Sequence, residues 1–302
     1  MGDFDRDPAI FIFGMDGSFR QCIRRPGAGP GEYERFDDFA VLSDGSLVLS
    51  CWNKVVKLAP DGRFLAEASI ASMGYADQIT AWNNRLMLYM LRTVAKESGH
   101  AVFGLSADLA PVNHMHPHDP RKDIYLYTNH DRFAVLKDNL WVSEMYRPTL
   151  SVYAADGTRT AQYVFPQKNA AELEDQWQAQ PFREENRTAI KNLMHRFMGM
   201  RVYRDGLLLF SFTQKPETDY RMMRFTPPGK LVVYSGYHPH NRAYADREPN
   251  FHTVCGQEGE PLVGVLTPEG GTPKVTAGIP NLAGLTFADD DNLALVFFDL
   301  KQ

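Results

Sequence analysis

Short apolar segments joined by tight turns recur along the whole chain. One series of turns joins two strand-like segments, as in IFIFGMDGSFRQCI and VVKLAPDGRFLAEASI. Asp-Gly and related glycine-bearing pairs supply the positive φ that short hairpin turns need. The first turn residues are Asp16, Asp61, Ala107, Asp156, Pro228 and Glu269, at spacings of 45, 46, 49, 72 and 41. These spacings indicate an internal repeat, whose least regular turn is Ala107-Asp108.

A second series of turns interleaves with the first. It includes VLSDGSLVLS, TAWNNRLMLYM, VLKDNLWVSEM, VYRDGLLLFSF and FADDDNLALVFF. Each repeat therefore predicts four short antiparallel strands. Repeats of about 40–50 residues with four strands are typical of β-propeller blades. The sequence predicts an all-β fold, a six-bladed β-propeller of four-stranded antiparallel blades, which forms a single domain over residues 1–302.

The two ends of the chain each predict half a blade. AIFIFGMDGSFRQCI supplies a third and a fourth strand, and GLTFADDDNLALVFFDL supplies a first and a second. Pairing of Leu293–Asp299 with Ala9–Phe13 is expected to close the ring and remove a free sheet edge. The pattern does not bound the strands of the blade between Leu231 and Ala277.

The longest spacing contains an insertion with helical periodicity, near residues 168–198. Asn169 and Glu172 resemble a capping box, and Pro181 ends that segment. A second helical face is predicted from the spacing of Ile190, Leu193, Met194, Phe197 and Met198. Two interpretations stay open, a helical pair packed on the propeller and a mobile lid over a site.

Composition and charge exclude some classes. The net charge of −5 and the lack of a basic block argue against nucleic-acid binding. No apolar run approaches the roughly 18 residues of a membrane span, and no signal peptide is visible at the start. Three cysteines, Cys22, Cys51 and Cys255, do not form a disulfide framework or a metal knuckle, so we expect free, buried thiols.

The glycine-rich stretch GAGPG has the composition of a phosphate-binding loop. It precedes no helix, however, and Glu32 stands where the last glycine of GxGxxG would be. We interpret it as a crossing between two blades, where glycine and proline let the chain turn sharply.

GPGEY (Gly29 to Tyr33), followed by DF, resembles a stretch of a family of six-bladed β-propellers related to NHL-repeat propellers of Gram-negative gut bacteria. The resemblance is strongest over Ile10 to Ile70. It implies an exported lipoprotein or a periplasmic, cell-envelope protein, although this chain shows no export signal and a cytoplasmic place is the alternative. The resemblance implies no general activity and no catalytic residues.

In a propeller, the innermost strands of the blades begin at one mouth of the central channel. The segments before these strands should therefore bring polar side chains from distant positions together, and a concave site with a few converging polar groups is a binding-site hypothesis. The candidate ligand-binding residues at this mouth are Asp37, Asp38, Asp77, His130, Arg132, Arg196, His252 and Asn281.

Two histidine sets are candidate metal ligands. His130 and His252, with Asp38 or Asp77, could hold a divalent ion such as Zn, Ca or Mg, because imidazole and carboxylate suit such metals. In NHMHPHDP, His114, His116 and His118 alternate and would share one face of an extended strand. The alternatives are solvated loop residues or strand-end caps for the first set and a structural role for the second.

Three functions follow from these patterns. The first is a binding protein that holds a small molecule, glycan or peptide at the channel mouth, where aromatic residues would suit a sugar ring. The second is a metal-dependent lyase or hydrolase, as the lactonase-type and amidating-lyase-type propellers imply. The third is a structural module of a larger assembly. The sequence indicates neither an oligomeric state nor a catalytic residue.

Overall fold

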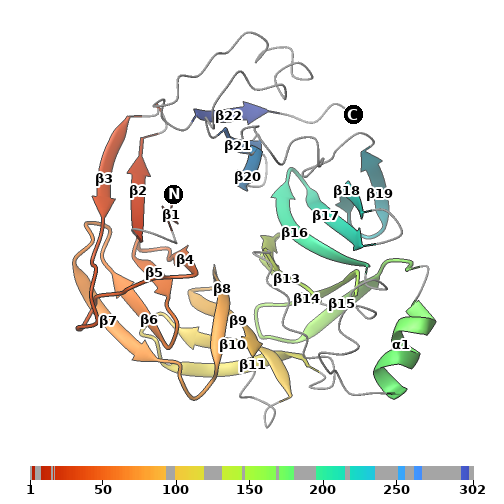
Figure 1. The fold of residues 1–302 in the computed structure, drawn as a ribbon, viewed down its shortest axis with the longest axis horizontal. Coiled ribbons are helices and arrows are strands. Elements are labelled where there is room, and N and C mark those ends of the chain that lie inside the picture. Colours follow the sequence, from red (N-terminus) through yellow and green to blue (C-terminus); the bar gives the residue numbers. More distant parts are fainter. Residues whose placement is uncertain are drawn as a thin grey trace. The chain divides into compact units, whose positions relative to one another are not determined.

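The structure is a computed structural model of the chain. It describes residues 2–3, 8–14, 16, 18–92, 99–118, 131–144, 147–167, 170–179, 195–214, 218–234, 251–255, 262–266 and 294–298. The chain divides into two compact units, Met1–Arg196 (unit 1) and Phe197–Gln302 (unit 2), whose strands are labelled in Figure 1. None of the helices in these ranges has the length and apolar character that a membrane span requires.

Unit 1 holds four antiparallel sheets in which strands consecutive in the chain are neighbours. The first sheet is β1 (Gly2–Asp3), β2 (Ala9–Phe13) and β3 (Phe19–Ile23). The second is β4 (Asp38–Val41), β5 (Leu47–Ser50), β6 (Lys54–Leu58) and β7 (Phe64–Ser69). The third is β8 (Tyr75–Trp82), β9 (Arg85–Arg92), β10 (His100–Ser106) and β11 (Pro111–Pro117). The fourth is β12 (Phe133–Leu136), β13 (Asn139–Ser143), β14 (Thr149–Tyr153) and β15 (Arg159–Val164).

The rest of the chain forms two further sheets. One is β16 (His195–Tyr203), β17 (Gly206–Gln214), β18 (Thr218–Thr226) and β19 (Lys230–Tyr234). The other is β20 (Phe251–Cys255), β21 (Leu262–Leu266) and β22 (Ala294–Phe298). The two strands β20 and β21 lie in the region between Leu231 and Ala277, whose strands the pattern did not bound.

The hairpins fall where the turn residues predict them. Five of the six turns in the first series join consecutive strands of one sheet, and the sixth, at Glu269, lies outside the described residues. In the second series, Asn83 and Asn84 connect β8 to β9 at φ of 49° and 57°. Asparagine and aspartate tolerate this left-handed conformation better than other non-glycine residues, which explains their place in the turns.

The chain ends pair differently from the expected closure. β2 lies between β1 and β3, with Ile10 opposite Gly2 and Ile23. β22 pairs along its length with β21. The strand partners of β2 and β22 are therefore not those of the expected pairing between Leu293–Asp299 and Ala9–Phe13. The two-residue strand β1 pairs with Ala9 and Ile10, on the edge of β2 that this pairing requires.

The insertion contains the helix α1 (Ala170–Ala179), which ends two residues before Pro181. Leu173 of α1 is buried in a cluster with residues of the third and fourth sheets, which supports a helix packed on unit 1. The second predicted helix is wrong at its C-terminal end, because Phe197 and Met198 belong to β16. The aromatic and β-branched residues of β16 favour a strand over a helix once sheet partners are available. Residues 180–194 lie outside the described residues.

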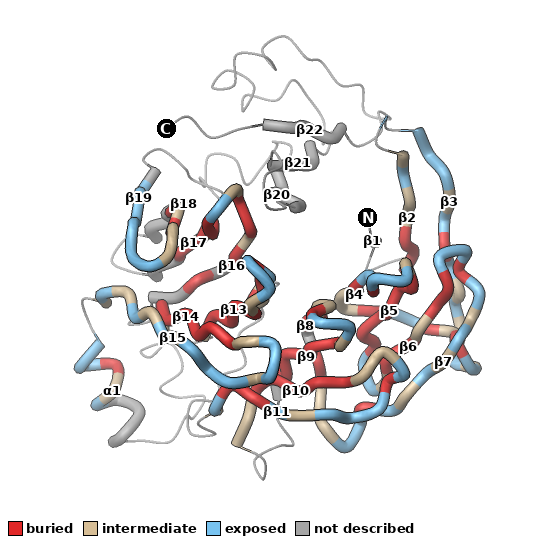
Figure 2. The backbone as a smooth tube through the Cα atoms, turned by 180° about the vertical axis from the view of Figure 1, so that it is seen from behind, coloured by how far each residue is buried: buried red, intermediate tan, exposed pale blue. Residues whose placement is uncertain are grey.

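The core of unit 1 lies between neighbouring sheets. Separate apolar clusters join the first sheet to the second, the second to the third, and the third to the fourth. Figure 2 shows the buried residues concentrated in strands such as β5 and β9, whereas β7 and β15 hold only half-buried and exposed positions. Face-to-face packing of four-stranded sheets leaves the strand ends free to carry polar groups.

Candidate functional site

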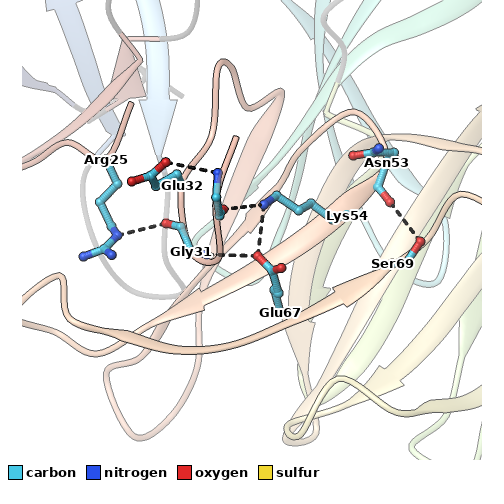
Figure 3. Close-up of polar contacts among 8 residues, drawn as sticks. Arg25, Gly31, Glu32, Asn53, Lys54, Glu67 and Ser69 are labelled. Atoms are coloured by element: carbon cyan, nitrogen blue, oxygen red, sulfur yellow. Dashed lines mark hydrogen bonds and ion pairs between the residues drawn. The ribbon is translucent and has the colours of Figure 1, made fainter. Parts of the chain in front are cut away.

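The GPGEY loop is held against the second sheet by hydrogen bonds to side chains of that sheet (Figure 3). The Gly31 N–H donates to Glu67 Oε2 at 2.9 Å, and Lys54 Nζ donates to the same oxygen at 3.0 Å. Lys54 also donates to the Gly29 carbonyl, and the Gly29 N–H donates to Glu32 Oε2. The Gly31 N–H and the Lys54 ammonium lower the pKa of Glu67. The loop amides are thus used by the protein's own carboxylates, which supports a connector rather than a phosphate site.

Glycine is required at one position of this loop. Gly31 has a φ of +71°, and a Cβ there would lie 2.4 Å from Cδ2 of Phe64. A side chain at this position would therefore clash with β7 as well as strain the backbone. The sharp turn and the close approach to the fourth strand of the sheet depend on this residue.

Asp37, Asp38 and Arg132 are the candidate ligand-binding residues of unit 1 whose side chains the structure describes, and they lie at one end of their sheets, which we call the first-strand end. There the first strands β4, β8 and β12 begin and the second strands β5, β9 and β13 end. Asp38 lies at the start of β4 and accepts two backbone hydrogen bonds, from Phe39 at 2.8 Å and from Ile79 at 2.9 Å. Because Ile79 lies in the next sheet, the Asp38 carboxylate joins two sheets.

Gln78 repeats this arrangement one sheet further along. Its Oε1 accepts a hydrogen bond from the Arg132 N–H at 2.6 Å, so a first-strand side chain again binds the backbone of the next first strand. Sequence reasoning missed Gln78, although the adjacent Asp77 was a candidate. Counting residues back from the Asn83-Asn84 turn would have aligned Gln78 with Asp38 and marked it as an acceptor.

Arg132 takes the corresponding place before β12, but its side chain behaves differently. The residue is fully buried, and no described group hydrogen bonds to its Nε, Nη1 or Nη2. The guanidinium carbon lies 5.2 Å from the centroid of the Tyr89 ring, a cation–π geometry. An isolated buried charge is costly, so this guanidinium is an exception that calls for a physical reason.

The serines that end the second strands show the same contrast. Ser50 lies opposite Asp38, and its Oγ donates to the Ala76 carbonyl of the next sheet at 2.9 Å. Ser143 donates its N–H to the Arg132 carbonyl at 2.9 Å, but its buried Oγ has no partner in the described part of the chain. Two equivalent strand ends therefore differ in whether their polar groups are satisfied.

Asp37 stands beside Asp38 and is partly engaged. Its N–H donates to the Ser50 carbonyl at 2.8 Å, and its Oδ1 pairs with Arg35. Its Oδ2 is buried without a hydrogen-bond partner among the described residues. Nearby, burial raises the pKa of the Cys51 thiol to about 12, which makes Cys51 an inert core residue. Cys22 is exposed, contrary to expectation.

The three alternating histidines do not share one face. His116 has a φ of +63°, which breaks the alternation of β11, and it is buried next to Met115 while His114 is exposed. His116 Nδ1 lies 3.1 Å from the Tyr153 hydroxyl, and burial, reinforced by His118 and Arg132, lowers the pKa of His116 to about 3. His116 is therefore neutral near pH 7 and serves the core. The prediction that the three histidines face one way is wrong.

No group of three or more His, Cys, Asp or Glu side chains within the described ranges is placed to hold a metal ion. His130 and Asn281 lie outside these ranges. Asp77, Arg196 and His252 lie in β8, β16 and β20, where the structure describes the strand but not these side chains. A Zn, Ca or Mg site built on His130 and His252 remains a prediction.

An exposed aromatic pair occupies the first-strand end of the second and third sheets. Trp52 follows Cys51 just beyond β5 and is 61% exposed. Its ring centroid lies 4.9 Å from that of Tyr75, the first residue of β8, at an interplanar angle of 45°. Tyr75 in turn packs against the buried cluster that contains Tyr89. The aromatic pair and the buried guanidinium thus border the same cluster.

A separate hollow lies between β15 and α1. Its volume is about 650 Å³, and the Arg147–Glu174 ion pair forms part of its wall with Val164 and Phe165. None of the candidate residues lines it, so it is independent of the first-strand end.

Successive antiparallel sheets, each built from consecutive strands and packed on the next, define a β-propeller. A model of the family described as "6-bladed beta-propeller" matches residues 3–200, so the chain belongs to this family of six-bladed β-propellers. This confirms the predicted fold class. A search of curated proteins finds no match to the chain.

Solved structures agree with the fold. The chain resembles a Bacteroides fragilis protein described as exported, with 14% identity, a TM-score of 0.69, and coverage of 98% of this chain and 86% of that one. A Bacteroides caccae protein of unknown function aligns with 8% identity and a TM-score of 0.45, over 88% of this chain and 80% of that one. Only the first TM-score is above 0.5, so only the first match supports the argument, and at 14% identity it supports the fold alone.

Proposed function

We propose that this propeller is a binding protein that holds a carbohydrate ring at the first-strand end of unit 1. The observation that carries the proposal is the contact between the Trp52 and Tyr75 rings, which are tilted by 45°, with Trp52 61% exposed. Exposed tryptophan is unusual because its large apolar surface favours burial. A tryptophan held open by a second ring, at an end lined with polar strand starts, offers the flat apolar face that a sugar ring covers.

The surroundings of the pair favour binding over catalysis. Asp38, the first residue of β4, uses both carboxylate oxygens to accept backbone hydrogen bonds. Cys51, which precedes Trp52, is held as a thiol by its burial. Asp38 and Cys51 therefore serve the fold, and the exposed aromatic surface is left to make the contacts.

The cell envelope is the proposed location. The Bacteroides fragilis protein with a similar fold is described as exported, and polysaccharides are abundant outside the cytoplasm. Detection of the native protein in the periplasmic or membrane fraction rather than the cytoplasmic fraction would support this location, and recovery in the cytoplasmic fraction alone would refute it.

The test compares two exposed aromatic residues. Trp52→Ala removes the proposed platform, whereas Phe19→Ala removes a matched side chain, 60% exposed and 5.9 Å from the Phe13 ring, beside a hairpin turn at the other end of its sheet. Wild type and both variants are applied to a panel of immobilised neutral and uronate-containing oligosaccharides. We expect Trp52→Ala to weaken the selected glycan at least tenfold and Phe19→Ala to leave it unchanged. No glycan binding by wild type, or equal losses in the two variants, would refute the proposal.

A further inference from the structure

We propose that Arg132 is a carboxylate-binding residue, and that the ligand of the first-strand end carries an acid group. The inference takes its location from the proposed function but rests on a different observation. That observation is a fully buried guanidinium whose three nitrogens have no hydrogen-bond partner among the described residues, with the Tyr89 ring beneath it.

The chemistry of the guanidinium points to an oxyanion. Arginine presents five N–H donors in a planar fork that matches the two oxygens of a carboxylate. Within the described residues no acceptor hydrogen bonds to the guanidinium nitrogens of Arg132. The hydrogen bond between Gln78 and Arg132 uses the backbone N–H of Arg132 instead. The Tyr89 ring holds the guanidinium plane without using its donors. The Tyr89 ring thus positions the guanidinium, and its N–H donors have no acceptor among the described residues.

The neighbouring sheets show that this position does not need a cation for structure. Asp38 and Gln78 occupy corresponding places, and each accepts a backbone N–H from the next sheet. An arginine side chain has no acceptor, so Arg132 cannot continue that pattern. A donor could still join two sheets by binding a carbonyl, as Ser50 does, but the Arg132 guanidinium makes no such hydrogen bond within the described residues.

The charge balance also favours a single negative group. His116 is neutral near pH 7, and the positive charge of Arg132 contributes to the lowered pKa of this residue, so His116 does not compensate the guanidinium. One carboxylate would neutralise one guanidinium. In a buried setting a charge-assisted hydrogen-bonded pair is stronger than in water, and it leaves neither charge isolated.

The acid site and the aromatic pair are connected through side-chain packing. Tyr89, under the guanidinium, belongs to the buried cluster against which Tyr75 packs, and the Tyr75 ring contacts the Trp52 ring. A uronic acid has both groups that these features would recognise, a ring with an apolar face and a carboxylate. Because Arg132 is not exposed, the ligand must part the covering side chains, and association is expected to be slow.

The experiment uses acetate, a carboxylate without a ring, and the full chain. Thermal unfolding is followed from zero to 200 mM sodium acetate at about pH 7, with sodium chloride added to keep the ionic strength constant. We expect the Tm of wild type to rise and saturate with acetate, and the Tm of Arg132→Met to show no dependence. Arg63→Met, which removes an exposed arginine at a hairpin turn, is the matched control and should respond as wild type does.

Inorganic phosphate at the same ionic strength forms a second arm. A larger rise with phosphate than with acetate would contradict the carboxylate assignment. No acetate-specific rise in wild type, or the same rise in wild type and Arg132→Met, would overturn the proposal.

A direct measurement covers the case in which Arg132→Met does not fold. The arginine Nε–Hε resonances of wild type are followed by NMR during titration with formate, and Arg132→Lys identifies the resonance of Arg132. A saturable shift of this resonance supports the site, and its absence refutes it. Since acetate and formate have no ring, these results are independent of the Trp52 glycan test, and either idea can fail alone.

Discussion

Unit 1 contains two equivalent strand ends with opposite chemistry. At the start of β4, Asp38 and Ser50 both reach the next sheet, through the Ile79 N–H and the Ala76 carbonyl. At the start of β12, Arg132 and Ser143 are joined by a backbone hydrogen bond, but their side-chain groups have no partner in the described residues. The first pair is satisfied and structural. The second is unsatisfied, although Ser143 is buried as Ser50 is and Arg132 is more deeply buried than Asp38.

This difference separates polar residues that hold the fold from polar residues available to a ligand. A buried group with all its hydrogen bonds made gains nothing from a ligand, whereas an unsatisfied one gains the full interaction. The expected position of a residue at a propeller mouth is therefore not enough to tell a ligand-binding residue from a structural one. The hydrogen-bond state of each side chain distinguishes them.

The largest effect is expected at the satisfied pair. Asp38→Ala removes the acceptor of two backbone N–H groups, and the Ile79 N–H is left unpaired between sheets. We expect the free energy of unfolding to fall by about 3 kcal/mol, measured by urea denaturation. Asp38→Asn, which keeps one acceptor oxygen, should lose less. A loss below about 1 kcal/mol in Asp38→Ala would show that the carboxylate does not join the sheets.

The opposite sign is expected at Arg132. Arg132→Met replaces an uncompensated buried charge with an apolar side chain of similar length, which should raise the free energy of unfolding by about 2 kcal/mol in chloride buffer. The comparison is again made by urea denaturation, without carboxylate present. If the variant is instead less stable than wild type, Arg132 has a structural role and the contrast with Asp38 disappears.

The smallest effects distinguish the two serines. Ser50→Ala loses the hydrogen bond to the Ala76 carbonyl and should cost about 1 kcal/mol. Ser143→Ala removes a hydroxyl without a partner among the described residues and should change stability by less than about 0.5 kcal/mol. Both values come from the same denaturation series. Equal costs at the two serines would mean that the Ser143 hydroxyl is satisfied in solution.

Local chemistry made most of the fold predictable. Turn residues such as Asn83-Asn84 determine where a hairpin bends, so the pairing of the two strands that a turn joins follows from the sequence. The partners of β2 and the strand state of Phe197 were not predictable, because both depend on which distant strand is available for pairing. Helical spacing in a short apolar run does not exclude a strand.

The candidate site was predictable in location only. Asp38 and Arg132 were both found by their place at the start of a first strand. Their roles differ because the Asp38 carboxylate accepts from the Ile79 N–H, 41 residues away, whereas the Arg132 guanidinium has no hydrogen-bond partner among the described residues. His116 shows the same limit, since one residue with positive φ moved it from a shared face into the core. Pairings and burial of this kind are properties of the folded structure.

The bonds made by Asp38 and Gln78 have a consequence for folding cooperativity. Each sheet of unit 1 is formed by consecutive strands, and each of these bonds connects one sheet only to the next. Stability in such an array is approximately the sum of each sheet's own term and the terms between nearest neighbours. Weakening the Asp38 bond should therefore let the first two sheets open without the third and fourth, and amide hydrogen exchange would speed up on one side of the junction before the other.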